Sequence, residues 1–194
     1  MPTVANTALL ICSRASLLIG GDAISSFSDT TAEATVANSV YEDIAQGLLT
    51  STRWRFASKQ SQLGRNSTAP LTRWDASYAL PTDSLMISTI TVQDLPIKYD
   101  IYGDNAFCNA VTTDIVIADY IYRADEATWP SYFITGVELS VASMLAMSVA
   151  KDVSLANAFE AKAERQLAKA RRLDSQQQTT KKLNTSRFIA ERRS

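Results

Sequence analysis

The spacing of hydrophobic residues divides the chain into helical segments at both ends and strand-like segments in the middle. At residues 3–19, 30–52 and 154–175, apolar side chains recur at three- and four-residue spacing, which predicts amphipathic helices. Residues 130–150 are apolar on almost every side, so we expect the most buried helix there. Residues 63–123 contain alternating and β-branched runs, which predict an antiparallel β region of three to five strands. The pattern therefore predicts an α+β fold, a helical bundle of about four helices with an inserted β region.

Local signals set the expected ends of these elements. Gly20 and Gly21 stop the first helix, while Thr30 and Glu33 have the spacing of a capping box at the start of the second. Pro130 is suited to an early helical position, where its missing N–H costs little. Residues 179–194 are polar and basic with few apolar side chains, so we assign residues 1–178 to one domain and 179–194 to a C-terminal arm.

The segment LTRWDASYALPTDSLMI, residues 71–87, leads into the predicted β region. We expect a strand, a turn and a second strand, because the Leu80-Pro81 pair forces an extended conformation and ends the first strand. Trp74 and Tyr78 are four residues apart, so in one continuous strand they would share a face. The segment is therefore interpreted as structural.

Charge is distributed unevenly along the chain. Residues 1–150 hold 8 basic and 15 acidic side chains, a net charge of −7, and residues 151–194 hold 11 basic and 5 acidic, a net charge of +6. An acidic body with a basic end indicates a partner for the basic end, either nucleic acid or an acidic protein surface.

The residue inventory excludes several kinds of chemistry. The chain has no histidine, which excludes Ser-His-Asp and Cys-His catalysis and histidine-ligated zinc. No Gly-rich phosphate-binding motif occurs, and we expect no cofactor. Carboxylate chemistry of the glycosidase type stays open, with Asp75 and Asp83, or Asp114 and Asp119, as candidate pairs. Aspartates beside a turn are commonly structural, so we expect no catalytic site.

Cys12 and Cys108 each lie among apolar residues, which predicts buried thiols in a reducing compartment. The apolar stretch at residues 133–150 is interrupted by Glu138 and serines and falls short of the roughly 20 apolar residues of a membrane span. We therefore expect a soluble protein without a membrane anchor.

Aromatic residues and prolines follow one another in a distinctive order across residues 5–178. The order comprises Trp54-Arg55-Phe56, then Trp74, Tyr78, Leu80, Pro81 and Asp83, then the run from Tyr120 to Arg123, and then Trp129-Pro130 and Phe133. In this order and spacing the chain resembles the head-to-tail adaptor proteins of tailed bacteriophages, of the tail tubular protein A type.

The resemblance implies a non-catalytic structural protein of the virion, made in the host bacterial cytoplasm. Such adaptors form a ring, usually of about twelve copies, under the portal protein at the capsid–tail junction. They extend the DNA channel without binding a particular DNA sequence, and they dock the tail nozzle or tube protein. An acidic body suits such a channel, because like charge disfavours adhesion to the phosphates of the DNA.

Two interaction surfaces follow as hypotheses. We expect the arm to bind an acidic portal surface through Lys181, Lys182, Arg187, Phe188, Ile189, Arg192 and Arg193. We expect the last helix to contact a neighbouring subunit through a basic stripe of Lys162, Arg165, Lys169 and Arg172. The alternatives are a non-catalytic assembly or scaffolding protein, and a carboxylate-based cell-wall hydrolase.

Overall fold

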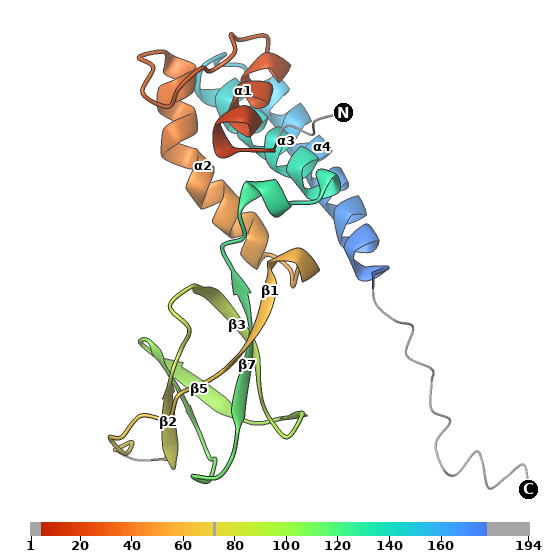
Figure 1. The fold of residues 1–194 in the computed structure, drawn as a ribbon. Helices are drawn as coiled ribbons and strands as arrows, with labels where there is room; N and C mark the ends of the chain where they lie inside the picture. Colours follow the sequence, from red (N-terminus) through yellow and green to blue (C-terminus); the bar gives the residue numbers. More distant parts are fainter. Residues whose placement is uncertain (1–4, 72, 178–194) are drawn as a thin grey trace, which may run out of the picture.

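The protein, described here by a computed structural model that covers residues 5–71 and 73–177, consists of two lobes joined by a narrow waist (Figure 1). The helical lobe contains α1 (Ala8–Leu18), α2 (Ala32–Thr50), α3 (Ser131–Ser148) and α4 (Val153–Ser175). The β lobe is inserted between α2 and α3. The waist, residues 51–57 and 123–130, includes the short 3-10 helices η1 (Arg55–Ala57) and η2 (Glu126–Thr128). The predicted α+β class, a four-helix bundle with an inserted antiparallel β region, is confirmed.

α3 is the central helix of the bundle and packs against α4, α1 and α2. The side chain of Leu167 on α4 packs directly onto the backbone of α3 at Gly136, where an added Cβ would lie 2.6 Å from Cδ2 of Leu167. By length and composition α3 could cross a membrane, contrary to our expectation from residues 133–150. Its contacts with three other helices account for the apolar residues around it.

The ends of α1 and α2 show where local signals were accurate and where they were not. The side chain of Thr31, not Thr30, caps α2 by accepting from the N–H of Ala34 at 3.3 Å, so the predicted capping box starts one residue early. Helix α1 begins at Ala8, later than the expected residue 3. It stops before Gly20, whose φ of +81° is the left-handed conformation expected of a glycine that ends a helix.

α3 and α4 begin close to the predicted positions. Helix α3 begins at Ser131 with Pro130 at its N-cap, one residue after the expected start at residue 130. Asp152 caps α4 through a 3.0 Å hydrogen bond from the N–H of Leu155. The buried residues of α4 are small or apolar, except for Asp174.

The β lobe contains two small antiparallel sheets. One has the strand order β1-β7-β3-β4, and the other β2-β6-β5. The strands are β1 (Ser58–Gln62), β2 (Ala76–Ala79), β3 (Ser84–Val92), β4 (Leu95–Pro96), β5 (Tyr99–Tyr102), β6 (Asn105–Cys108) and β7 (Val116–Tyr122). The described strands exceed the expected three to five in number because most are short. The sheets pack together through a shared apolar cluster that includes Tyr78, Cys108, Ile90 and Val116.

The segment at residues 71–87 differs from its prediction in one respect. β2 and β3 flank a turn after Leu80-Pro81, as expected, but β2 begins at Ala76. Arg73 has a φ of +71°, which interrupts extended backbone just before Trp74. The prediction that Trp74 and Tyr78 share a face of one strand is therefore wrong.

The aromatic residues of the waist form the lower end of the helical core. A 3-10 turn at residues 55–57 brings both Trp54 and Phe56 onto Phe133, each with ring centroids 5.0 Å away. Trp129 packs edge-on against the same ring at 5.0 Å. These contacts join both waist segments to α3. Cys12 and Cys108 are free and buried, which confirms the prediction of buried thiols.

Candidate functional site

The candidate carboxylate Asp75 comes directly before β2, whereas Asp83 comes directly before β3, beyond β2 and the turn that follows it. A strand of four residues spans about 13 Å at about 3.3 Å per residue, and glycosidase carboxyl groups are about 5–9.5 Å apart. Asp83 forms an ion pair with Lys59 at 2.9 Å, and this hydrogen bond lowers the pKa of the Asp83 carboxyl. The backbone N–H of Asp75 donates to Asn109 at 3.1 Å. The structure does not bring the first pair together.

The carboxylates of Asp114 and Asp119 also have separate partners and do not interact with each other. Asp114 closes the turn before β7 by accepting from the N–H of Val111 at 2.9 Å. Asp119 lies within β7, is 9% exposed, and pairs with Arg53 of the waist at 2.9 Å. Among the described residues, no group of three His, Cys, Asp or Glu side chains could hold a metal ion. These carboxylates have evident structural partners.

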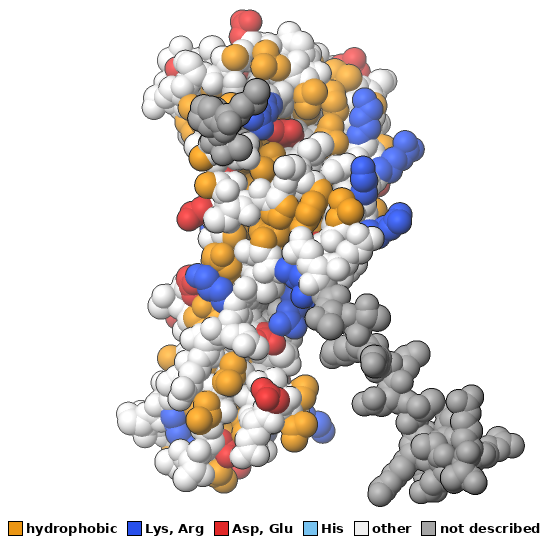
Figure 2. Space-filling model, turned by 45° about the vertical axis from the view of Figure 1, so that its right-hand side comes forward, with side chains coloured by type: hydrophobic (Ala, Val, Ile, Leu, Met, Phe, Trp, Pro, Cys, Tyr) orange, Lys and Arg blue, Asp and Glu red, His pale blue; other side chains and the backbone are white. Residues whose placement is uncertain are grey.

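The predicted basic stripe is an exposed flank of α4. Lys162, Arg165, Lys169 and Arg172 are all exposed, and none forms a salt bridge within the described part of the chain. Figure 2 shows Lys and Arg side chains in a column over α4. We call these four residues the basic flank. The predicted arm residues, Lys181, Lys182, Arg187, Phe188, Ile189, Arg192 and Arg193, lie outside the described residues.

A groove of about 460 Å³ runs between α2 and α4 and is floored by α3. Its apolar lining includes Ile44 and Leu48 of α2 and Met144 and Met147 of α3. Met144 is 40% and Met147 54% exposed, although both belong to the most apolar helix of the bundle. Since such side chains gain stability from burial, this groove is a candidate contact surface.

Glu160 and Glu164 line the same groove from α4. Each lies two residues from Lys162, and two residues correspond to about 200° around a helix. The acidic pair and the basic flank therefore face different directions. Neither glutamate forms a salt bridge to another described residue. Our sequence interpretation missed this acidic pair, although its i,i+4 spacing was a visible signal.

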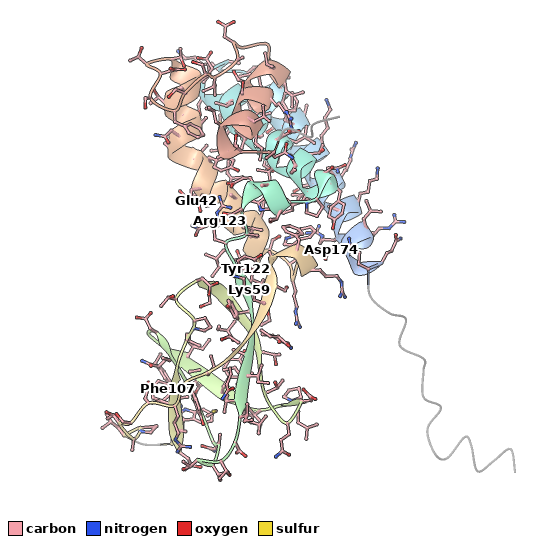
Figure 3. The ribbon with its side chains drawn as sticks, in the orientation of Figure 1. Glu42, Lys59, Phe107, Tyr122, Arg123 and Asp174 are labelled. Carbon is pink, nitrogen blue, oxygen red and sulfur yellow. The ribbon has the colours of Figure 1, made fainter. Side chains whose placement is uncertain are left out.

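Arg123 organises a charged network across the waist (Figure 3). Its guanidinium donates to both carboxylate oxygens of Glu42, at 2.8 and 2.9 Å, and also to Glu126. The hydrogen bond from Arg123 lowers the pKa of Glu42. Burial raises the pKa of Tyr41, whose hydroxyl donates to Glu126 at 3.0 Å. The network holds the strand leaving the β lobe against α2.

Asp174 fastens the end of α4 to the waist (Figure 3). It is 4% exposed and accepts from the backbone N–H of Arg55 at 3.1 Å and from the hydroxyl of Tyr132 at 2.9 Å. Burial and this carboxylate together raise the pKa of Tyr132 to about 12. The three residues belong to α4, η1 and α3, so one carboxylate joins three elements.

No known protein-family profile matches the chain, and a search of proteins with curated functions finds no match.

Proposed function

We propose that this chain is a structural head-to-tail adaptor of a tailed bacteriophage, which forms a ring under the portal protein, extends the DNA channel and docks the tail nozzle or tube. It is made in the host bacterial cytoplasm and acts without catalysis at the capsid–tail junction of the virion. The ordered aromatic and proline residues give the resemblance on which the proposal rests. The fold is compatible with it, since a helical bundle can form a ring wall while the β lobe makes separate contacts.

The structural observation that supports a ring is the pair of unlike surfaces on the helical lobe. One is the basic flank of α4, and the other is the groove with Glu160 and Glu164. Two different surfaces that complement each other produce a head-to-tail contact, which closes into a ring when the rotation between copies is suitable. The basic flank of one copy would pair with the glutamates of the next, while the neighbouring helix covers Met144 and Met147.

A charge exchange tests this contact. Lys169→Glu alone and Glu164→Lys alone each place like charges across the interface, which costs several kcal/mol and should abolish rings. The double variant restores opposite charges and should restore ring assembly. Native mass spectrometry of the full chain, with and without portal ring from the same phage, gives the copy number. Asp43→Lys, an exposed change on α2 outside the groove lining, is the control. Failure of the double variant to restore assembly would reject the pairing.

The same measurement tests the adaptor role and the arm. A ring-sized adduct on the portal supports the adaptor, and truncation after Gln178 should abolish it if the basic arm binds the portal. An adduct that survives truncation supports the adaptor proposal and rejects the hypothesis that the arm binds the portal. A persistent monomer that never binds the portal would reject the adaptor and favour an assembly role with another partner.

A further inference from the structure

In addition to the groove of the helical lobe, the β lobe contains a cavity of about 690 Å³. It lies on the face of sheet β2-β6-β5 that is turned away from the other sheet. Strand register places Ser77 opposite Phe107, and Asn105 opposite Tyr102, so these four side chains share that face. The opposite face carries Tyr78, Ala106 and Cys108, which pack into the β-lobe core. Residues 66–71, together with Arg73 and Trp74, supply the remaining wall.

The apolar part of the lining is aromatic. Tyr102 and Phe107 pack edge to face with centroids 5.4 Å apart, and Tyr102 is 53% exposed. Trp74 contributes its indole from the segment before β2. The solvent-facing side of an antiparallel sheet usually carries polar residues, because an aromatic ring there gains little stability from burial. Three aromatic residues around one cavity are typical of a binding site.

The polar part of the lining has unused hydrogen-bonding capacity. Asn66 donates through Nδ2 to Oδ1 of Asn105 at 2.8 Å and to Oγ of Ser77 at 3.1 Å, which fixes both amides. Within the described residues, Nδ2 of Asn105 and Oδ1 of Asn66 make no side-chain hydrogen bond. The Nε1 of Trp74 is buried and has no partner among the same residues. The site therefore offers donors and an acceptor at fixed positions.

We infer that this cavity binds a neutral pyranose saccharide, a mono- or disaccharide unit. Each sugar hydroxyl donates and accepts, which matches the amides of Asn66 and Asn105 and the Trp74 N–H. The C–H face of a pyranose ring packs on an aromatic ring such as Tyr102 or Phe107.

Charge argues against an anionic ligand. Arg73 lines the cavity, but its guanidinium lies 3.8 Å from the carboxylate of Asp100. Residues 58–122 contain 4 basic and 7 acidic side chains, a net charge of −3. A phosphorylated ligand such as a nucleotide would meet net repulsion here. The volume lies within the roughly 300–1,000 Å³ of small-molecule sites.

Saturation-transfer NMR on the full chain tests the inference. The probes are glucose, galactose, mannose, N-acetylglucosamine and their 1,4-linked disaccharides, each at about 10 mM, which is tenfold above a Kd of roughly 1 mM. At least one sugar should show transfer to its ring C–H protons. Tryptophan fluorescence should respond to the same sugar, because Trp54 and Trp129 are buried with their indole N–H groups bonded to backbone carbonyls. A fluorescence change therefore reports Trp74.

Two variants locate the binding. Trp74→Phe keeps an aromatic ring and removes one donor, so binding should weaken about three- to tenfold. Asn105→Leu keeps a similar volume and removes the amide, so binding should weaken more. Met86 is exposed and lines a different cavity of the β lobe, so Met86→Ala should leave sugar binding unchanged. Thermal melts establish that each variant is folded.

Absence of transfer from every sugar to the wild-type chain would overturn the inference. So would sugar binding that Trp74→Phe, a conservative change, leaves unaltered. The assay needs neither portal nor ring, so its failure is separate from a failure of the adaptor proposal.

Discussion

The buried carboxylate of Asp174 provides the sharpest test of how the two lobes are joined. In Asp174→Ala, the backbone N–H of Arg55 and the hydroxyl of Tyr132 lose their acceptor. Hydrogen bonds to a charged group contribute about 1.5–3 kcal/mol each, and the two share one acceptor, so they are not fully additive. Removing a negative charge from the last turn of α4 returns about 0.3–1 kcal/mol through the helix dipole. The expected net loss of unfolding free energy is about 2–4 kcal/mol.

Urea denaturation followed by circular dichroism measures this loss, and thermal melting should show a Tm lower by about 5–15 °C for a chain of this size. A tyrosine absorbance titration gives a second readout. The pKa of Tyr132, raised to about 12 in the wild type, should fall toward the ordinary value of 10.0. Because the folded pKa is the higher one, the stability that this tyrosine contributes is present below pH 10 and is lost as the pH rises toward about 12.

Asp43→Ala is the matched control, since it also removes a carboxylate from a helix, and Asp43 is exposed, lies outside the groove lining and makes no salt bridge to another described residue. Its unfolding free energy should stay within about 0.5 kcal/mol of the wild type. If Asp174→Ala behaves like this control and leaves the alkaline tyrosine titration unchanged, the assigned role of Asp174 in the waist is wrong.

Two further predictions concern helix packing and acid stability. Gly136→Ala should destabilise by about 1 kcal/mol, because the contact with Leu167 outweighs the gain in helix propensity, whereas Gly47→Ala, with no atom within 4 Å of the new Cβ, should stabilise by about 1 kcal/mol. The same sign for both in urea denaturation would contradict the close approach of α3 and α4. The pKa of Glu42 is lowered by Arg123, so its stabilisation is present above the ordinary value of 4.5 and is lost as the pH falls below it. Glu42→Gln should reduce this acid-side slope in denaturation midpoints measured at successive pH values, and an unchanged slope would exclude the ion pair as its source.

The sequence predicted the elements whose signals are local. Helical periodicity depends on the fixed backbone period of 3.6 residues, and it located the four helices and their order. Pro130 and Gly20 marked helix ends correctly, because a fixed φ and a left-handed φ act on the residue itself. Thr31 was missed by one residue since two neighbouring threonines can both cap. The start of β2 was missed because the left-handed φ of Arg73 has no glycine to signal it.

The candidate sites were decided by the tertiary structure. Asp174 and Arg55 are 119 residues apart in the chain, and Asn66 and Asn105 are 39 apart, so no local period relates them. The basic flank of α4 was visible as a sequence stripe, but the groove that opposes it requires three helices to pack side by side. Charge and periodicity along one element thus follow from the sequence alone. Which surfaces remain open follows from how the elements bury one another, since the same exposed stripe could have been covered by a neighbour.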